Sequence, residues 1–235
     1  MKVKNGRPVY FLLIVLVTLF LCWLLFQRKQ YQTISLVVVV AACLPFFYRY
    51  EKKQLNIKEL VLIAVLTTIA VSGRVLFYMI PAVTPMSAVI ILTGICMGSE
   101  VGFLVGSLSA VTSNILFGQG PWTPFQMFSW GMIGLIAGFP LLRQQLQKQY
   151  WLLSAYGIFA GLFFSFFMDV WTVFSLDHAF SWARYVALLV TAAPYTLTYC
   201  MANVFFSCLL LRTFRRRLQR ILIKYNIREV EESRK

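Results

Sequence analysis

Long apolar segments, separated by short polar ones, make up most of the chain. A helix needs about 20 mostly apolar residues to cross a bilayer, so these segments predict membrane-spanning helices. Residues 9–26 and 33–48 give the first two. Further along we expect six more helices, at 58–80, 86–98, 100–117, 124–141, 150–174 and 184–211. The second and third of these six are short and meet at Gly98, because one continuous helix over 86–117 would be longer than the hydrocarbon layer is thick.

A charged segment at 49–59 divides the chain into two parts of different composition. The helices before it are rich in Leu and Val, whereas those after it carry Gly, Ser, Thr and Pro, and small residues favour close helix–helix packing. We therefore expect an all-α integral membrane protein. It has a two-helix N-terminal extension at 1–55, a six-helix membrane module at 56–212 and a basic tail at 213–235.

The composition excludes two broad classes of protein. Apolar residues make up 60% of the chain and charged residues 13%, against about 45–50% and about 25% in soluble domains. Such a chain has too few polar residues to cover the surface of a water-soluble enzyme. It also has too many apolar and aromatic residues for intrinsic disorder. The sequence predicts a multi-pass protein of the cell membrane, in contact with the lipid bilayer.

The net charge of +14 is unevenly distributed along the chain. Nine of the 22 basic residues lie at 212–235, and a basic tail next to a membrane is typical of a topology and lipid-headgroup signal rather than of nucleic-acid binding. With both termini in the cytoplasm, 18 basic residues face the inside, three face the outside and Arg74 lies within a helix. This asymmetry predicts eight spans, cytoplasmic termini and module loops on the outer face at 81–85, 118–124 and 175–183.

Few residues are suited to catalysis or metal binding. His178 is the only histidine, and it lies in an expected outer loop, where a solvated turn residue is the more common role. The five cysteines lie within apolar segments, at spacings that fit neither a metal site nor a redox pair. The chain also has no phosphate-binding glycine loop. We therefore expect no enzymatic activity, no bound cofactor and no metal site.

Three ionisable residues lie within or at the edge of the apolar segments. Glu100 is expected in the first turn of its helix, where it complements the helix dipole. Arg74 and Asp169 lie deeper, where a charge costs about 2.5–3.5 kcal/mol unless it has a partner or a water-filled cavity. They could pair with each other, reach the surface, or line a polar cavity that opens to the outside.

The most distinctive segment is the turn at 117–127. Its two glycines and two prolines favour a tight, fixed turn, which places Trp122 at the membrane edge. Trp122 alone would fit an interfacial aromatic anchor. The amides of Asn114, Gln119 and Gln126 go beyond what an anchor needs. Apolar walls with a few amides are typical of a pocket for a polar organic molecule.

Small residues recur at every fourth position on two of the expected helices, which places them along one helix face. One set, here called the Ala64 stripe, consists of Ala64, Thr68 and Ser72. The other set, here called the glycine stripe, consists of Gly98, Gly102, Gly106 and Ala110. Such stripes allow two helix backbones to approach closely. We expect the glycine stripe to pack inside the module, whereas the Ala64 stripe could face a separate protein.

Together these features resemble the substrate-binding S components of energy-coupling factor (ECF) vitamin transporters. The resemblance covers about 56–215 and is most specific at 117–138, where the Gly-Gln-Gly-Pro-Trp turn is followed by further glycines. It implies that the Ala64 stripe takes the place of the family's Ala-xxx-Ala docking motif, with Thr68 in place of the second Ala. It also implies capture of a vitamin at the outer face. Uptake is then powered by a transmembrane coupling subunit and two cytoplasmic ATPase subunits, so ATP is used by the partners only.

The same resemblance suggests a substrate and a site. The turn and the pair Asp169 and Trp171 look most like those of cobalamin-type S components, with riboflavin and pantothenate as alternatives. We expect the substrate site near the outer ends of four helices, formed by Arg74, Tyr78, Asn114, Gln119, Trp122, Gln126, Asp169, Trp171 and Tyr195. The competing interpretation is a stand-alone secondary transporter or membrane enzyme, although the chain has no convincing inverted repeat.

Overall fold

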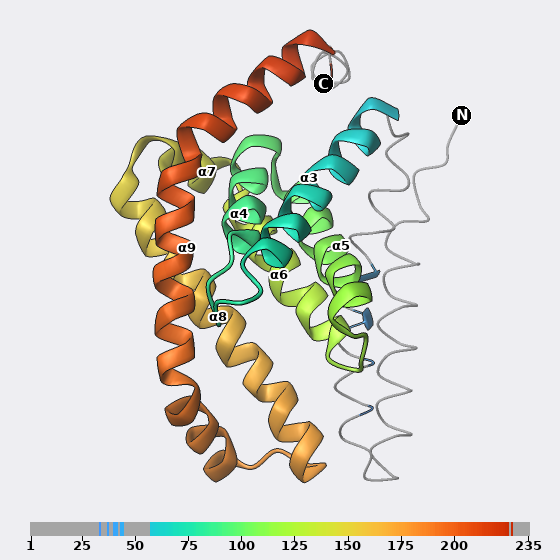
Figure 1. Cartoon of the computed structure of the whole chain (residues 1–235), viewed down its shortest axis with the longest axis vertical. Coiled ribbons are helices and arrows are strands. Elements are labelled where there is room, and N and C mark those ends of the chain that lie inside the picture. Colours follow the sequence, from blue (N-terminus) through green and yellow to red (C-terminus); the bar gives the residue numbers. More distant parts are fainter. Residues whose placement is uncertain are drawn as a thin grey trace, which may run out of the picture.

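The computed structural model describes residues 57–225 and 227, together with 33, 37, 40, 41, 43 and 44 (Figure 1). The predicted span at 9–26 therefore lies outside the described residues, as do most of the span at 33–48 and nearly all of the chain after Tyr225. The described part is helical, with α3 (Ile57–Leu76), α4 (Met86–Met97), α5 (Ser99–Phe117), α6 (Thr123–Ala137), α7 (Pro140–Lys148), α8 (Tyr150–Asp177) and α9 (Trp182–Lys224).

All six helices predicted after residue 56 are present, although α3 and α6 end four residues earlier than predicted, at Leu76 and Ala137. Two larger features also differ from the prediction. Helix α7 occupies a segment in which we expected a loop, and α9 continues past Leu211 to Lys224, into the predicted tail. Pro140 lies in the first turn of α7, where its fixed φ suits a helix start. The segment 212–224 contains neither Gly nor Pro, so nothing in it interrupts the helical hydrogen bonds of α9.

Fewer helices qualify as membrane spans than the six expected in the module. Among the described residues, four helices are long and apolar enough to cross a membrane, namely α3, α5, α8 and α9. Helices α6 and α7 count as a fifth only together, and they are bent by 76°. Helix α4 has 12 residues, which extend about 18 Å at about 1.5 Å per residue, less than a hydrocarbon layer of about 30 Å. The chain is a multi-pass membrane protein in which α4 is covered by neighbouring helices, because nearly all of its residues are buried.

The helices run between two ends of the bundle (Figure 1). Helices α8 and α9 pack against each other along one side. The turn between them marks the lower end in this view, and the α5–α6 turn points the same way. The upper end carries the start of α3, helix α7 and the last part of α9. At this end the Lys58 ammonium group donates a hydrogen bond to the Tyr225 carbonyl oxygen at 2.9 Å, which joins the end of α9 to the start of α3.

Helices α5 and α6 approach each other closely through glycines. A methyl group at Gly102 would overlap the carbonyl oxygen of Gly134, and one at Gly106 would overlap the carbonyl oxygen of Trp130. Both Gly102 and Gly106 belong to the glycine stripe, so its predicted packing inside the module is confirmed. Buried aliphatic side chains from α3, α4, α5 and α6 surround this crossing and form the main core. The crossing fixes the position of the α5–α6 turn relative to the end of α3.

Candidate functional site

Arg74 reaches from the last turn of α3 to the end of α5. Its Nη1 donates hydrogen bonds to the Ser113 hydroxyl at 2.6 Å and to Oδ1 of Asn114 at 3.3 Å. The guanidinium carbon lies 4.8 Å from the centre of the Phe117 ring and 5.4 Å from that of a Trp130 ring. At such distances a cation is attracted by the ring face. Arg74 is half-buried and is held in place by neutral groups.

The side chains of Asn114, Gln119, Thr123 and Gln126 form a hydrogen-bonded group, here called the amide cluster. The Asn114 amide nitrogen donates to Thr123 Oγ1 at 2.9 Å and to Gln126 Oε1 at 2.7 Å. The Thr123 hydroxyl donates in turn to Gln119 Oε1 at 2.9 Å. Asn114 is only 1% exposed, so these bonds satisfy a polar group that would be costly to bury alone. The amide cluster joins the end of α5 to the start of α6 and, through Asn114, to Arg74.

Local contacts tie the turn between α5 and α6 in place. Gly118 ends α5 with a φ of 105°, a backbone conformation that glycine adopts without strain. The Gln119 amide nitrogen donates to the Val111 carbonyl oxygen at 2.9 Å. The ring of Trp122 packs so closely against Gly120 that a methyl group there would overlap the indole. Trp122 is 38% exposed, so part of its ring remains accessible beside the turn.

A second polar network centres on Trp130. Its indole nitrogen donates to the Ser87 hydroxyl at 3.2 Å and to the Tyr199 hydroxyl at 3.1 Å, and these two hydroxyls are hydrogen-bonded to each other. Tyr199 also stacks with Tyr195, with 6.5 Å between the ring centres. Trp130 in turn lies beside Arg74, with 5.4 Å between the guanidinium carbon and the centre of an indole ring. The network therefore connects α4, α6 and α9 to the region around Arg74.

A surface hollow with a volume of about 360 Å³ is lined by Arg74, Tyr78, Leu116 and Phe117, and is here called the Arg74 hollow. The Tyr78 ring stacks on the Phe117 ring, with 4.9 Å between their centres, although Tyr78 remains 67% exposed. The volume falls at the low end of the range of about 300–1,000 Å³ that is typical of ligand pockets. The Arg74 hollow thus presents one cation between aromatic and aliphatic walls.

Asp169 and Trp171 lie in a different environment on α8. Trp171 is buried, and its ring centre lies 5.0 Å from that of Phe125, within an apolar cluster. In the part of the chain that the structure describes, Arg74 and Asp169 share no hydrogen bond or ion pair, and Asp169 Oδ2 is buried without a partner. The structure therefore does not show a pairing of these two charges, which was one of the alternatives that the sequence left open. Glu100, by contrast, lies in the first turn of α5 as predicted.

The structure brings only part of the predicted site together. Two of its features, the Arg74 hollow and the amide cluster, connect five of the nine predicted residues, namely Arg74, Tyr78, Asn114, Gln119 and Gln126. Trp122 adjoins them at the turn, and Tyr195 is linked to the region only indirectly, through its stacking on Tyr199. Among the described residues, neither Asp169 nor Trp171 is hydrogen-bonded to this group; both lie on α8, where Trp171 packs against Phe125.

Four side chains that shape this region were not among the site residues predicted from the sequence, namely Ser113, Phe117, Thr123 and Trp130. A signal existed for Ser113 and Phe117, since they are four residues apart and so lie on one face of their helix. Thr123 also had a signal, because it lies between two predicted residues in the turn. No local pattern pointed to Trp130, because its contact with Arg74 depends on how α6 is placed beside α3 and α5.

The Ala64 stripe lies on an exposed face of α3. All three of its residues are exposed, as are the larger apolar side chains of Val65 and Ile69 beside them. The Thr68 hydroxyl donates to the Ala64 carbonyl oxygen at 2.9 Å, so this polar group is satisfied within the helix. The Ala64 stripe therefore presents a shallow, mostly apolar surface.

The chemistry that this arrangement offers is noncovalent recognition. The described residues contain no group of three or more His, Cys, Asp or Glu side chains that could hold a metal ion. His178 is exposed and ends α8 with a φ of 54°, as a turn residue. Around the Arg74 hollow, one guanidinium, several amides and several ring faces lie close together. Such groups can orient and hold an organic molecule.

Comparisons with known proteins were informative at the level of the family. Residues 58–214 match the model of a family described as ECF transporter, substrate-specific component. No curated protein and no solved structure matches the chain. The matched segment includes the whole of the Arg74 hollow and of the amide cluster. The chain therefore belongs to the family of substrate-specific components of ECF transporters, which are membrane proteins that bind a transport substrate and are not enzymes.

Proposed function

We propose that this protein captures a vitamin at the outer face of the cell membrane for ATP-driven uptake by partner subunits. As a member of its family, it is the substrate-specific membrane component of an ECF transporter, and such components pair with an energy-coupling module. The proposal adds the class of substrate, the side of capture and the residues that perform it.

The observation that carries the proposal is the Arg74 hollow with the amide cluster beside it. Phe117 and Tyr78 offer ring faces to the apolar surface of a ligand, while Arg74 can fix its orientation. Because Asn114 is buried and bonded to both Arg74 and Gln126, these groups are positioned before a ligand arrives. Positioning of this kind reduces the entropy lost on binding.

The remaining predicted site residues have different parts in this proposal. Trp122 and Gln119 extend the contact surface along the α5–α6 turn, and Tyr195 extends it toward α9. Asp169 and Trp171 lie apart from the Arg74 hollow on α8, so in this proposal they would contact only a ligand that extends past the turn toward Phe125.

The distribution of charge supports an outward-facing hollow. Lys58, Arg143 and the arginines of α9 beyond Leu211 belong to elements at the upper end of the bundle, whereas Arg74 and Arg184 belong to segments toward the lower end (Figure 1). Cytoplasmic segments carry an excess of Lys and Arg. We therefore place the upper end and both chain termini in the cytoplasm, and the opening of the Arg74 hollow outside.

Energy coupling would take place through α3. The Ala64 stripe is exposed and its small residues allow another helix to approach closely. We place the transmembrane coupling subunit on this face, with two cytoplasmic ATPase subunits bound to that subunit. ATP is then consumed by the partners, and this chain needs no cofactor of its own.

Cobalamin is the first vitamin to test, because the turn and the Asp169–Trp171 pair resemble those of cobalamin-type S components. A corrin ring with its nucleotide is larger than the Arg74 hollow, so cobalamin would also have to cover Trp122 and Tyr195. Riboflavin and pantothenate are smaller alternatives.

Two measurements test the proposal. Mass spectrometry of the purified protein identifies any small molecule that it retains, and titration with cobalamin, riboflavin and pantothenate then gives affinities. We expect Gln126→Ala to weaken binding by about 10- to 100-fold, the size expected when a polar partner is stranded. Trp122→Ala should weaken it at least as much, because it removes a ring face from the contact surface. Gln145→Ala on α7 and Trp182→Ala at the start of α9 are controls, since both residues are exposed and outside the site. If no vitamin binds and no small molecule is retained, the proposed function fails. If a vitamin binds and Gln126→Ala and Trp122→Ala bind it as tightly as the controls do, the turn is only an interfacial anchor.

A further inference from the structure

The charge of Arg74 is not balanced by a carboxylate in the described part of the chain. Four of the protein's eight acidic residues are described, namely Glu59, Glu100, Asp169 and Asp177. Glu59 lies at the opposite end of α3 from Arg74, about 22 Å away at about 1.5 Å per residue. Glu100 lies in the first turn of α5, whereas Arg74 contacts the last turn of that helix. Asp177 is paired with another arginine, and Asp169 is not bonded to Arg74.

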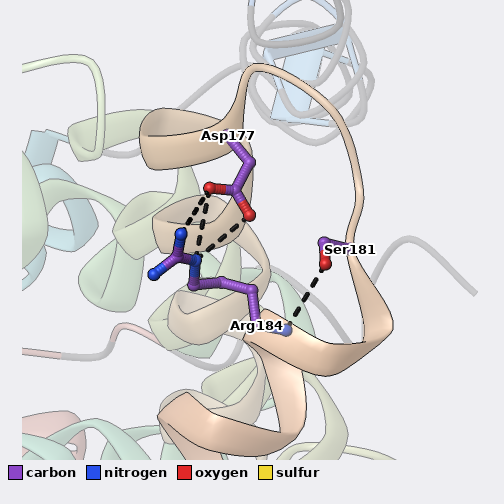
Figure 2. Close-up of polar contacts among 3 residues, drawn as sticks. All are labelled: Asp177, Ser181 and Arg184. Atoms are coloured by element: carbon purple, nitrogen blue, oxygen red, sulfur yellow. Dashed lines mark hydrogen bonds and ion pairs between the residues drawn. The ribbon is translucent and has the colours of Figure 1, made fainter.

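Arg184 shows how the same side chain is neutralised elsewhere in this protein. Its Nε lies 3.2 Å from Oδ1 and 3.1 Å from Oδ2 of Asp177, and its Nη2 lies 2.9 Å from Oδ1 (Figure 2). One edge of the guanidinium, formed by Nε and Nη2, therefore faces both oxygens of the carboxylate. This is the fork-like geometry that arginine forms with planar anions. Arg184 is exposed and already has its anion.

Arg74 has the same fork, but only part of it is used. Its hydrogen bonds to Ser113 and Asn114 both come from Nη1. Among the described residues, neither Nε nor Nη2 has an acceptor. A guanidinium has five N–H donors and no acceptor, so several donors remain for another molecule. The side chain lines the Arg74 hollow, and Phe117 and Trp130 hold its plane in position.

We propose that the transported substrate carries an anionic oxygen group, a carboxylate or a phosphate, which binds the free donors of Arg74 in the Arg74 hollow. This inference rests on the proposed function and specifies the chemical class of its substrate. The anion supplies the charge that the described residues do not supply, and the Phe117 and Tyr78 rings receive the apolar part that adjoins it. A half-buried cation with free donors selects such a group over a neutral isostere, because the charged form makes the stronger hydrogen bonds.

The experiment compares ligands that differ mainly in the anionic group. The pairs are pantothenate and pantothenol, riboflavin 5′-phosphate and riboflavin, and cobinamide phosphate and cobinamide, two corrinoids that differ in the phosphate. Each is titrated into purified wild-type protein in lipid nanodiscs. In a pair that binds, we expect the anionic member to bind at least about tenfold more tightly, as for hydrogen bonds to charged groups. The first pair reports on a carboxylate and the other two report on a phosphate.

Three variants assign this preference to Arg74. Arg74→Gln should abolish the difference between the members of the pair, and Arg74→Lys should restore part of it, because lysine keeps the charge and loses the fork. Arg184→Gln is the matched control and should leave the difference unchanged, since the charge of Arg184 is already paired. Thermal unfolding of each variant shows whether it is folded. Even if Arg74→Gln does not fold, the comparison of anionic and neutral ligands on the wild-type protein tests the preference for an anion.

Each result bears on a different claim. Equal or tighter binding of the neutral members, or a folded Arg74→Gln variant that keeps the preference, overturns the inference and leaves vitamin capture standing. The inference is also overturned, and vitamin capture still stands, if the wild-type protein retains a small molecule with neither a carboxylate nor a phosphate. If none of the six compounds binds and nothing is retained, the proposed function fails and the inference fails with it.

Discussion

The amide nitrogen of Asn114 lies 2.7 Å from Oε1 of Gln126 and donates a hydrogen bond to it. This bond joins the end of α5 to the start of α6 across the turn, and it uses the side-chain oxygen of Gln126, one of the predicted substrate-site residues. Asn114 also accepts a hydrogen bond from Arg74. Asn114 is therefore the residue through which the position of the turn and the position of the cation depend on each other.

Replacing Asn114 with Leu should destabilise the protein and weaken substrate binding. The apolar side chain leaves the partners of Asn114 without its hydrogen bonds in a buried place, which costs about 1–3 kcal/mol. Thermal unfolding of the detergent-solubilised protein measures the first effect, and ligand titration measures the second. Gln145→Leu, an exposed amide on α7, is the control. Equal stability of Asn114→Leu and the control would show that the amide cluster does not hold the turn.

Replacing Gly102 with Ala should force α5 and α6 apart. The added methyl group would overlap the carbonyl oxygen of Gly134, and backbone atoms cannot move aside as a side chain can. Overpacking of this kind costs about 1–3 kcal/mol. The measurement is again thermal unfolding, with Thr191→Ala on the exposed side of α9 as the control. A variant with the stability of wild type would mean that the two helices are not in contact at this glycine.

Bulky residues in the Ala64 stripe should block assembly while leaving substrate binding intact. Ala64→Leu and Thr68→Trp hold a partner helix away, because close approach needs small side chains. Copurification with the coupling and ATPase subunits measures assembly, and titration of the isolated protein measures binding. Leu197→Trp, at an exposed position of α9, is the control. Normal assembly of both stripe variants would place the docking face elsewhere.

Reporter fusions should place the two ends of the bundle on opposite sides of the membrane. We expect a reporter fused after Lys235 to be active in the cytoplasm, and one inserted in the turn at 118–122 to be active outside. The physical basis is the excess of basic residues in the segments of the upper end. An externally active fusion at Lys235 would reverse the proposed orientation and turn the Arg74 hollow toward the cytoplasm.

The predicted helices were correct where the apolar pattern was strong and the boundary chemistry was clear. Gly98 and Gly118 mark the ends of helices as expected, and both have the positive φ that glycine tolerates. Helix α7 and the last part of α9 were missed because the prediction relied on long apolar segments. Both segments are charged but amphipathic, with Leu142 and Leu146 in α7 and Leu218 and Leu222 in α9 four residues apart, which is helical spacing. Helix α4 was predicted as a span from its hydropathy, yet its length does not fit one.

The sequence by itself determined the class of the protein, the positions of its main helices and the family to which it belongs, because hydropathy and small-residue spacing are local properties of the chain. Hydropathy also indicated that Arg74, Asn114 and Asp169 are embedded in apolar segments. It could not determine the direction in which each helix face points. Only the tertiary structure placed Asn114 against Arg74 and left Asp169 apart from both, because those directions are set by the close crossing of α5 and α6 and by the packing of α8 against α9.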